Sequence, residues 1–190
     1  MGVILLTGVP GTGKSTIGSI LASRLGCEVI EVGKLARDRG LTLGWDEERE
    51  SEVLEVDGVR RELHQELVKC RSKACVVISL YPDLVSPEFV DKVVILRCDP
   101  AILAERLKKR GYNKKKIVEN IEAEIVDFCG AEACRVFPAH VIFEVDVSRS
   151  SPREVADLVL EIVRGKKKPS REAIVWPQGP LVLQSIKKDP

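Results

Sequence analysis

The sequence predicts an α/β fold, in which helices flank a parallel sheet, and two observations lead to it. Short apolar runs alternate with amphipathic stretches along most of the chain, as strands and helices do in such folds. The first apolar run also leads directly into a glycine-rich segment that opens a helical stretch. The chain of 190 residues is long enough to bury a core and suits one domain with small inserts.

Five short runs rich in apolar and β-branched side chains are predicted to be the strands of the sheet. They cover residues 3–6, 28–32, 75–80, 93–96 and 141–145. The helices between them are predicted over residues 14–25, 59–70, about 114–133 and about 151–164. Gly26 ends the first helix, and Ser151 opens the last through a capping box with Glu154. Asp99-Pro100 opens a further helix, because proline suits the first helical position.

Composition and charge exclude several classes of protein. The formal net charge of +1 gives no global field toward nucleic acids or membranes, and no apolar run approaches the roughly 20 residues of a membrane span. The first apolar run has no basic flank before it, so we expect a soluble, cytoplasmic protein without a signal peptide. None of the six cysteines forms a CxxC pair, which favours reduced, mostly buried thiols, with structural disulfides as the alternative.

Three segments depart from the alternation of strands and helices. Residues 46–57 hold seven acids and one arginine, whereas residues 106–116 hold seven positive charges and no acid. After Gly165 the chain turns rich in lysine and proline. We therefore predict a main domain over residues 1–164 and a C-terminal extension over residues 165–190, partly extended or disordered, with a short apolar patch at residues 181–183.

The strongest signal in the chain is the segment Gly8-Val9-Pro10-Gly11-Thr12-Gly13-Lys14-Ser15, which matches the phosphate-binding pattern GxxxxGK[ST]. Glycines let backbone N–H groups turn toward phosphates, and the following helix N-terminus favours negative charge. Lys14 is predicted to reach the β- and γ-phosphates of ATP, and the Ser15 hydroxyl to be a ligand of Mg²⁺. The residues predicted to bind the nucleotide are Gly11, Thr12, Gly13, Lys14, Ser15 and Thr16. The Asn-Lys-x-Asp motif that reads the base in GTPases does not occur.

Two further segments narrow the class. One is Glu31-Val32-Gly33-Lys34-Leu35-Ala36-Arg37, followed by Gly44-Trp45-Asp46-Glu47-Glu48 and Asp57. The other is Arg106-Leu107-Lys108-Lys109-Arg110-Gly111-Tyr112-Asn113 with its lysines, followed by Glu119-Asn120-Ile121 and Glu124. With the phosphate loop, they make residues 2 to about 163 resemble the adenylate kinase isoenzyme 6 family.

That resemblance implies a P-loop NTPase fold with a five-stranded parallel sheet and helices on both faces. It implies an insert that binds a nucleoside monophosphate at about residues 31–54 and a lid at about residues 109–119. In the insert, Gly33 and Arg37 would bind the acceptor, since a guanidinium binds phosphate bidentately. In the lid, Arg110 and Arg106 would join Lys14 in neutralising the transferring phosphoryl group, and Arg110 would also bind ATP.

The sequence departs from the family at the end of the third core strand. Family members usually carry aspartate and histidine there, whereas this chain carries Ser79 and Tyr81, with Asp83 as a nearby substitute or an alignment shift as the explanation. We expect phosphoryl transfer to survive this change better than ATP hydrolysis, because the attacking phosphate oxygen is already ionised. Tyr81 and Trp45 are predicted to pack, with base stacking as the alternative for Trp45. His64 and His140 are expected to be structural.

Three functions remain open on this basis. The first is a nucleoside monophosphate kinase that converts ATP and AMP, or another monophosphate, to two diphosphates. The second, implied by the resemblance, is a nucleotide-switched factor in small ribosomal subunit maturation. It would bind a platform ribosomal protein, and its lid and residues 166–171 would contact pre-ribosomal RNA. The third is a module that binds ATP without turnover, because Ser79 and Tyr81 have replaced reactive groups.

Overall fold

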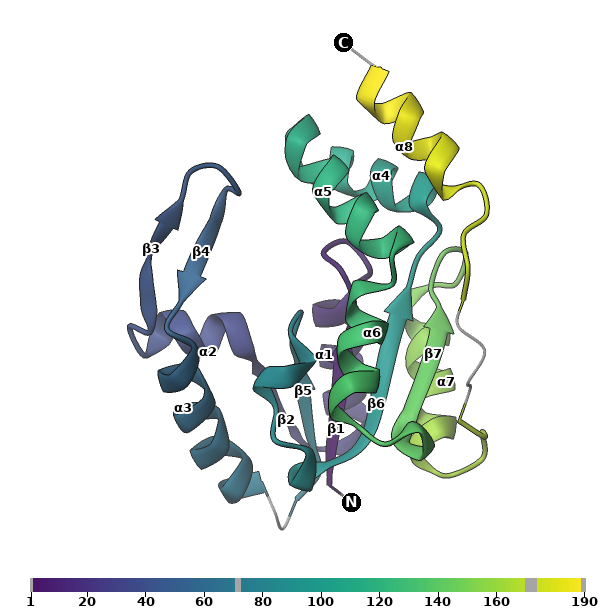
Figure 1. Ribbon diagram of the computed structural model, residues 1–190. Helices are drawn as coiled ribbons and strands as arrows, with labels where there is room; N and C mark the ends of the chain where they lie inside the picture. Colours follow the sequence, from purple (N-terminus) through teal and green to yellow (C-terminus); the bar gives the residue numbers. More distant parts are fainter. Residues whose placement is uncertain (1, 71–72, 170–173, 189–190) are drawn as a thin grey trace.

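The computed structural model describes residues 2–70, 73–169 and 174–188, and its core is a five-stranded parallel sheet in the order β2-β5-β1-β6-β7 (Figure 1). The strands are β1 (Val3–Thr7), β2 (Glu28–Glu31), β5 (Cys75–Ile78), β6 (Val90–Arg97) and β7 (Ile142–Asp146). The central strand β1 is buried along its whole length, as its uninterrupted apolar sequence predicts. The predicted fold class is confirmed.

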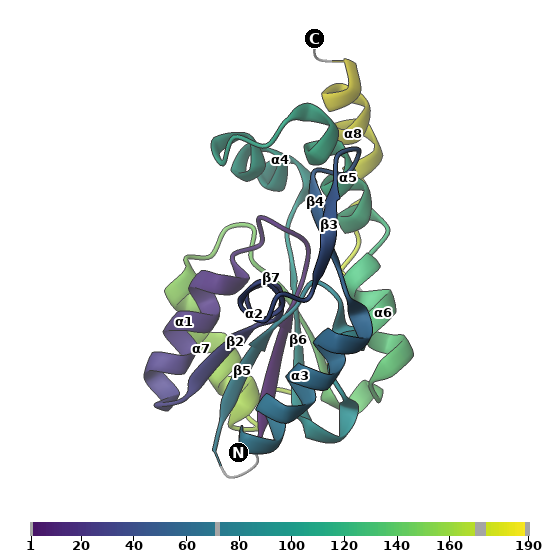
Figure 2. The same ribbon diagram turned by 90° about the vertical axis from the view of Figure 1, so that its left-hand side faces the viewer.

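Helices cover both faces of this sheet. On one face lie α1 (Lys14–Leu25) and α7 (Pro152–Val163), and on the other lie α3 (Val56–Lys69) and α6 (Phe128–Val136) (Figure 2). The capping box predicted at Ser151 is present, since Ser151 and Glu154 exchange side chain-to-backbone hydrogen bonds. Short 3₁₀ turns complete the connections at η2 (Pro82–Leu84), η3 (Pro87–Phe89) and η4 (Ala139–Val141).

The carboxyl ends of three neighbouring strands meet at one edge of the sheet. In the register of the ladder, Ile78 of β5 lies between Leu6 of β1 and Glu31 of β2. In open parallel sheets this is the edge at which ligands bind. Residues that follow these strands are therefore brought together although they are far apart in the sequence.

Two elements rise from this edge and face each other (Figure 1). One is formed by α2 (Val32–Asp38) and an antiparallel hairpin of β3 (Thr42–Asp46) and β4 (Ser51–Leu54). The other is formed by α4 (Pro100–Lys109) and α5 (Lys114–Ile125). The acidic segment at residues 46–57 thus forms mostly the hairpin's tip and second strand.

The single helix predicted over about 114–133 is wrong. The structure holds two helices, because α5 ends at Ile125 and α6 begins at Phe128. Asp127 lies between them with a φ of 53°, and its side chain accepts a hydrogen bond from the Gly130 N–H at the start of α6. A local cap of this kind competes with helix propagation, and apolar periodicity does not reveal it.

The C-terminal extension is more ordered than its composition predicts. Its last described part forms α8 (Gly179–Lys188), which packs against α4 and α5. Of the predicted apolar patch, Val182 and Leu183 pack against the core, whereas Leu181 is exposed. Residues 170–173 lie outside the described residues. Within the described ranges, no helix is both long and apolar enough to cross a membrane.

Candidate active site

The phosphate loop joins the end of β1 to the start of α1, and its shape requires glycine. Gly8, Gly11 and Gly13 have φ values of 141°, 93° and 93°, which are left-handed conformations that other residues rarely adopt. A Cβ on Gly8 would lie 2.5 Å from the Leu96 carbonyl oxygen, and one on Gly11 would lie 2.6 Å from Leu103 Cδ1. The glycines therefore serve both the turn and the close packing beneath it.

Lys14 lies folded over this loop. Its Nζ donates to the carbonyl oxygens of Gly8 at 2.5 Å and Val9 at 3.0 Å. Burial lowers the pKa of Lys14 to about 8, and the nearby Arg110 charge acts in the same direction. An anion bound in the loop would favour the charged ammonium, so the site is electrostatically complementary to phosphate.

The other loop residues have distinct surroundings. The buried Thr12 hydroxyl donates to the Val9 carbonyl at 2.9 Å, which holds the loop's turn. The Ser15 hydroxyl donates to Glu31 Oε2 at 3.1 Å, at the end of β2. Thr16 faces a cavity of about 270 Å³ that it shares with Arg106 and Arg110.

That cavity lies between the phosphate loop, α4 and the segment after β7. Arg106 is held there by hydrogen bonds from Nη2 to the carbonyls of Val147 at 2.8 Å and Ser148 at 3.0 Å. Arg110 ends α4 and lines the same cavity. Both arginines predicted for the lid thus lie on the side of the phosphate loop that faces the segment after β7. The charge of Arg110 helps to lower the pKa of Lys14.

A second cavity, of about 210 Å³, is lined by Lys14 and includes both predicted acceptor residues. Gly33 and Arg37 line it from α2, together with Ser15 and Glu31. Arg37 Nη1 forms an ion pair with Glu52 Oε2 of β4 at 2.9 Å, and its side chain remains half exposed. The Arg37 guanidinium is therefore already paired with a carboxylate in this structure.

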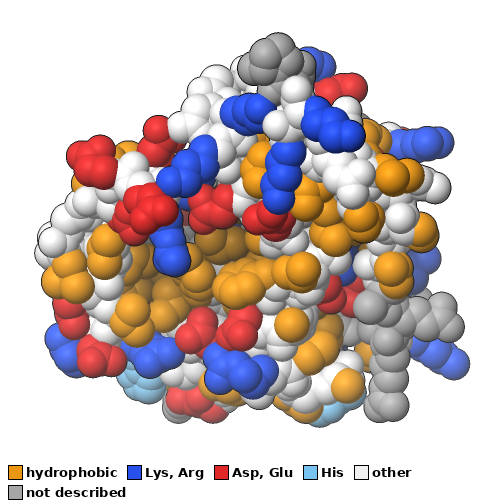
Figure 3. All heavy atoms as spheres, turned by 45° about the horizontal axis from the view of Figure 1, so that its top comes forward, with side chains coloured by type: hydrophobic (Ala, Val, Ile, Leu, Met, Phe, Trp, Pro, Cys, Tyr) orange, Lys and Arg blue, Asp and Glu red, His pale blue; other side chains and the backbone are white. Residues whose placement is uncertain are grey.

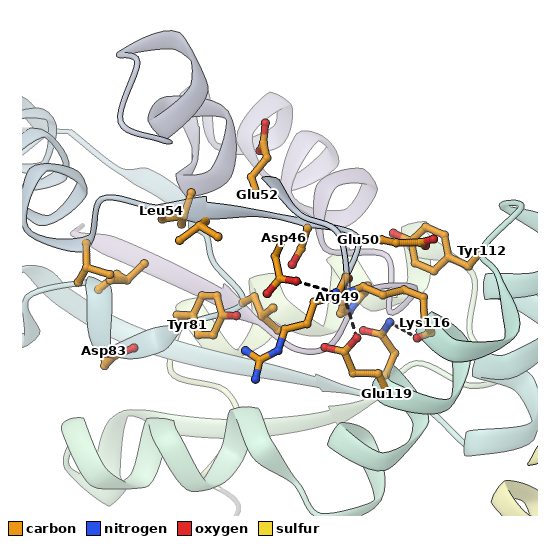
Figure 4. A pocket seen from close by; sticks show the side chains of 17 residues that line it. Asp46, Arg49, Glu50, Glu52, Leu54, Tyr81, Asp83, Tyr112, Lys116 and Glu119 are labelled. Atoms are coloured by element: carbon orange, nitrogen blue, oxygen red, sulfur yellow. Dashed lines mark hydrogen bonds and ion pairs between the residues drawn. The ribbon is translucent and has the colours of Figure 1, made fainter. Parts of the chain in front are cut away.

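A cleft of about 550 Å³ extends this second cavity between the hairpin and α5. Its walls include apolar side chains, and charged groups stand along its rim (Figure 3). Tyr81 and Arg49 point into the cleft, and Lys116 and Glu119 reach toward it from α5 (Figure 4). Lys116 Nζ donates to the Arg49 carbonyl at 2.6 Å, so the two walls touch at the hairpin's tip.

Ser79, Tyr81 and Asp83 follow β5, and each of them lines the second cavity or the cleft. The Ser79 hydroxyl donates to the Tyr81 carbonyl at 2.8 Å and accepts from the Tyr81 N–H at 3.1 Å, which closes a tight local turn. Asp83 is paired with Arg60 of α3 at 3.0 Å. Tyr81 packs edge-on against Phe128, at a centroid distance of 6.2 Å, and also lines the cleft.

The packing predicted for Trp45 is wrong. This side chain is 56% exposed on the hairpin, because the two-stranded sheet has no layer covering that face. His64 packs edge-on against Phe89 at a centroid distance of 5.1 Å, which agrees with a structural role. Four of the six cysteines are buried, and all six are free thiols.

One buried charge network was missed by sequence reasoning. Arg97, at the end of β6 and 1% exposed, forms ion pairs with Glu124 at 2.8 Å, Asp127 at 2.8 Å and Glu144 at 3.2 Å. Burial alone would lower the pKa of Arg97, but these carboxylates raise it. The network connects α5 and the start of α6 to the sheet. Of its four members, only Glu124 is among the residues that carry the resemblance in the sequence.

The donor set also fits Mg²⁺ bound together with a nucleotide. Among the residues that the structure describes, no group of three or more His, Cys, Asp or Glu side chains is suited to a metal ion. Mg²⁺ in nucleotide sites keeps several waters and takes few protein ligands beside the phosphates. The Ser15 hydroxyl with the neighbouring Glu31 carboxylate provides hard oxygen donors of that kind.

Fold and site together define a P-loop nucleotide-binding protein with a kinase-type fold. A family model described as AAA domain matches residues 4–127. A protein of Methanocaldococcus jannaschii named "Putative adenylate kinase" is 32% identical over 86% of this chain and 87% of that protein. A protein of the same name from Thermococcus onnurineus is 37% identical over 92% and 91%. The chain therefore belongs to the family of these archaeal adenylate kinase-like proteins. Residues 4–127 of the chain form its AAA domain.

A solved structure supports the fold independently. Shikimate kinase from Acinetobacter baumannii, in complex with shikimate, superposes with a TM-score of 0.59 over 88% of this chain and 95% of that chain. Its sequence identity is 19%, so the likeness concerns the fold alone.

Proposed function

We propose that this protein transfers the γ-phosphoryl group of ATP to a nucleoside monophosphate, with AMP as the first candidate acceptor. The observation that carries the proposal is that the phosphate loop borders two cavities, one lined by Arg106 and Arg110 and the other by Lys14 and Arg37. The relatives named for adenylate kinase activity support the same choice of substrates.

In this proposal the phosphate loop binds the donor's phosphates through backbone N–H groups. Lys14 leaves the carbonyls of Gly8 and Val9 and pairs with the β- and γ-oxygens. Arg37 exchanges Glu52 for the acceptor phosphate and places its oxygen in line with the transferring group. Mg²⁺, when bound, neutralises charge on the phosphates.

The lid arginines supply the remaining positive charge. Arg110 approaches from the end of α4, and Arg106 fixes the segment after β7 beside the donor. Contact between the hairpin and α5 excludes water from the cleft, which limits loss of the phosphoryl group by hydrolysis. Because Ser79 is neutral and engaged in its own turn, it offers no base for water, and transfer exceeds ATP hydrolysis.

A coupled assay with ATP, Mg²⁺ and each of AMP, CMP, dAMP and UMP tests this function. We expect the highest turnover with AMP and a loss of about 100-fold or more in Lys14→Ala. Robust ATP hydrolysis without transfer to any of the four acceptors would contradict the proposal. The relatives' names and the site's geometry do not bear on a ribosomal protein or pre-ribosomal RNA, and no such partner is proposed.

A further inference from the structure

Glu31 stands at the point where the metal would meet the protein. It is the last residue of β2, half buried, and its Oε2 accepts the hydrogen bond from the Ser15 hydroxyl at 3.1 Å. Glu31 also lines the same cavity as Lys14 and Ser15, so its carboxylate lies beside the phosphate loop.

Other groups at this edge of the sheet are already engaged. Ser79 follows Ile78, the residue that pairs with Glu31 across the ladder, but its hydroxyl is used by the Tyr81 backbone. Asp83 is turned toward α3 by its ion pair with Arg60. Among the described residues that line the second cavity, the one that contains Gly33 and Arg37, Glu31 is the one carboxylate.

We propose that Glu31 is the positioning residue for Mg²⁺ in this protein, a role that rests on the proposed function. Ser15 would be the direct ligand, and Glu31 would accept hydrogen bonds from the waters that the ion retains. A carboxylate on β2 would thereby do the work that neutral Ser79, just after the adjacent strand β5, cannot do. The same carboxylate also orients the Ser15 hydroxyl so that its oxygen lone pairs are free for the ion.

Metal affinity tests this assignment without any turnover. Mn²⁺ serves as the probe, and its binding to the protein–ADP complex is followed by electron paramagnetic resonance. Glu31→Gln keeps the shape of a half-exposed side chain and removes its charge, so the fold is retained. We expect Mn²⁺ affinity to fall by about 10-fold or more, as with other outer-shell partners, while ADP affinity in EDTA does not fall.

Asp83→Asn is the matched control, since it makes the same chemical change near the end of the neighbouring strand. It should leave Mn²⁺ affinity unchanged, because Asp83 faces Arg60. A double-variant cycle with Ser15→Ala sharpens the result: because Glu31 would contact the ion's waters directly, Glu31→Gln should still lower Mn²⁺ affinity once the Ser15 hydroxyl is removed.

Wild-type Mn²⁺ affinity in Glu31→Gln, or an effect that vanishes wholly in the Ser15→Ala background, would overturn the role of Glu31. These outcomes differ from a failure of the proposed function. That failure would appear as absent ADP and ATP binding, or absent transfer, in the unaltered protein.

Discussion

The indole Nε1 of Trp176 donates a hydrogen bond to Glu124 Oε1 over 2.9 Å, and so joins the C-terminal extension to the buried charge network of the main domain. A second bond, from the Ile174 N–H to Glu144 Oε2 at 2.9 Å, reaches another carboxylate of the same network. The extension therefore completes the hydrogen bonding of groups that Arg97 alone does not satisfy.

Replacing Trp176 by phenylalanine should destabilise the protein. The change keeps most of the ring and removes the donor, and a hydrogen bond to a charged group contributes about 1.5–3 kcal/mol. Urea unfolding should show a loss of that size. Trp45→Phe is the matched control on the exposed hairpin and should stay within about 0.5 kcal/mol of the unaltered protein. Equal effects of the two changes would show that the Trp176–Glu124 bond contributes nothing.

Arg97→Met should be far more costly at neutral pH, because it leaves buried carboxylates without their partner. Removing one member of a buried ion pair typically costs about 3–5 kcal/mol. Burial already raises the pKa values of Glu124 and Asp127, and without Arg97 they rise further. The folded variant then binds protons more tightly than the unfolded chain, so its stability should recover as the pH falls from 7 to 5. A deficit independent of pH would contradict this account.

ATP binding should take up a proton near pH 8. Burial lowers the pKa of Lys14 to about 8, so about half of the free protein carries a neutral amine at that pH. The bound phosphates require the ammonium, which raises its pKa again. Affinity should therefore be retained below pH 7 and be lost as the pH rises above 8. Calorimetry in buffers of different ionisation enthalpy should show uptake of about half a proton at pH 8 and little at pH 6.5. Lys14→Ala should abolish the difference.

Arg37→Ala should weaken the acceptor and spare the donor. Loss of a charged hydrogen-bonded contact predicts a rise of about 10- to 100-fold in the KM for AMP, with unchanged ATP affinity. Arg39 is a matched arginine at the end of the same helix, but its ion pairs are with Glu62 and Glu66 of α3. Arg39→Ala should leave both constants near their original values. An equal rise in both variants would remove Arg37 from the acceptor site.

Sequence reasoning predicted the sheet and the phosphate loop because both depend on local patterns. Buried parallel strands are continuous apolar runs, and the glycine spacing of the loop follows from its backbone angles. The β3–β4 hairpin was missed because its tip is acidic and none of its strand residues is buried, so no apolar alternation marked it. The helix break at Asp127 was hidden for a different reason, since apolar residues continue on both sides of it.

The partners of charged residues could not be predicted, because they come from elements distant in the sequence. Arg97 and Glu144 lie on adjacent strands, and Trp176 belongs to a segment whose composition suggested disorder. Likewise, Ser15 and Glu31 are 16 positions apart, and only the folded chain shows that the loop's hydroxyl meets a carboxylate. The spacing of residues in the sequence identifies the groups that can react, whereas the topology of the fold determines which of those groups lie in contact.

The hydrogen bond that joins the two walls of the cleft uses a side chain from one wall and the main chain of the other. Lys116 supplies a side chain, whereas the hairpin supplies only the main-chain oxygen of Arg49. The hydrogen bond therefore does not depend on which side chain stands at position 49, and that side chain, which lines the cleft, can change while the contact is kept. Position 116, by contrast, needs a side chain long enough to carry a donor across to the hairpin, so the contact depends on the side chain from α5.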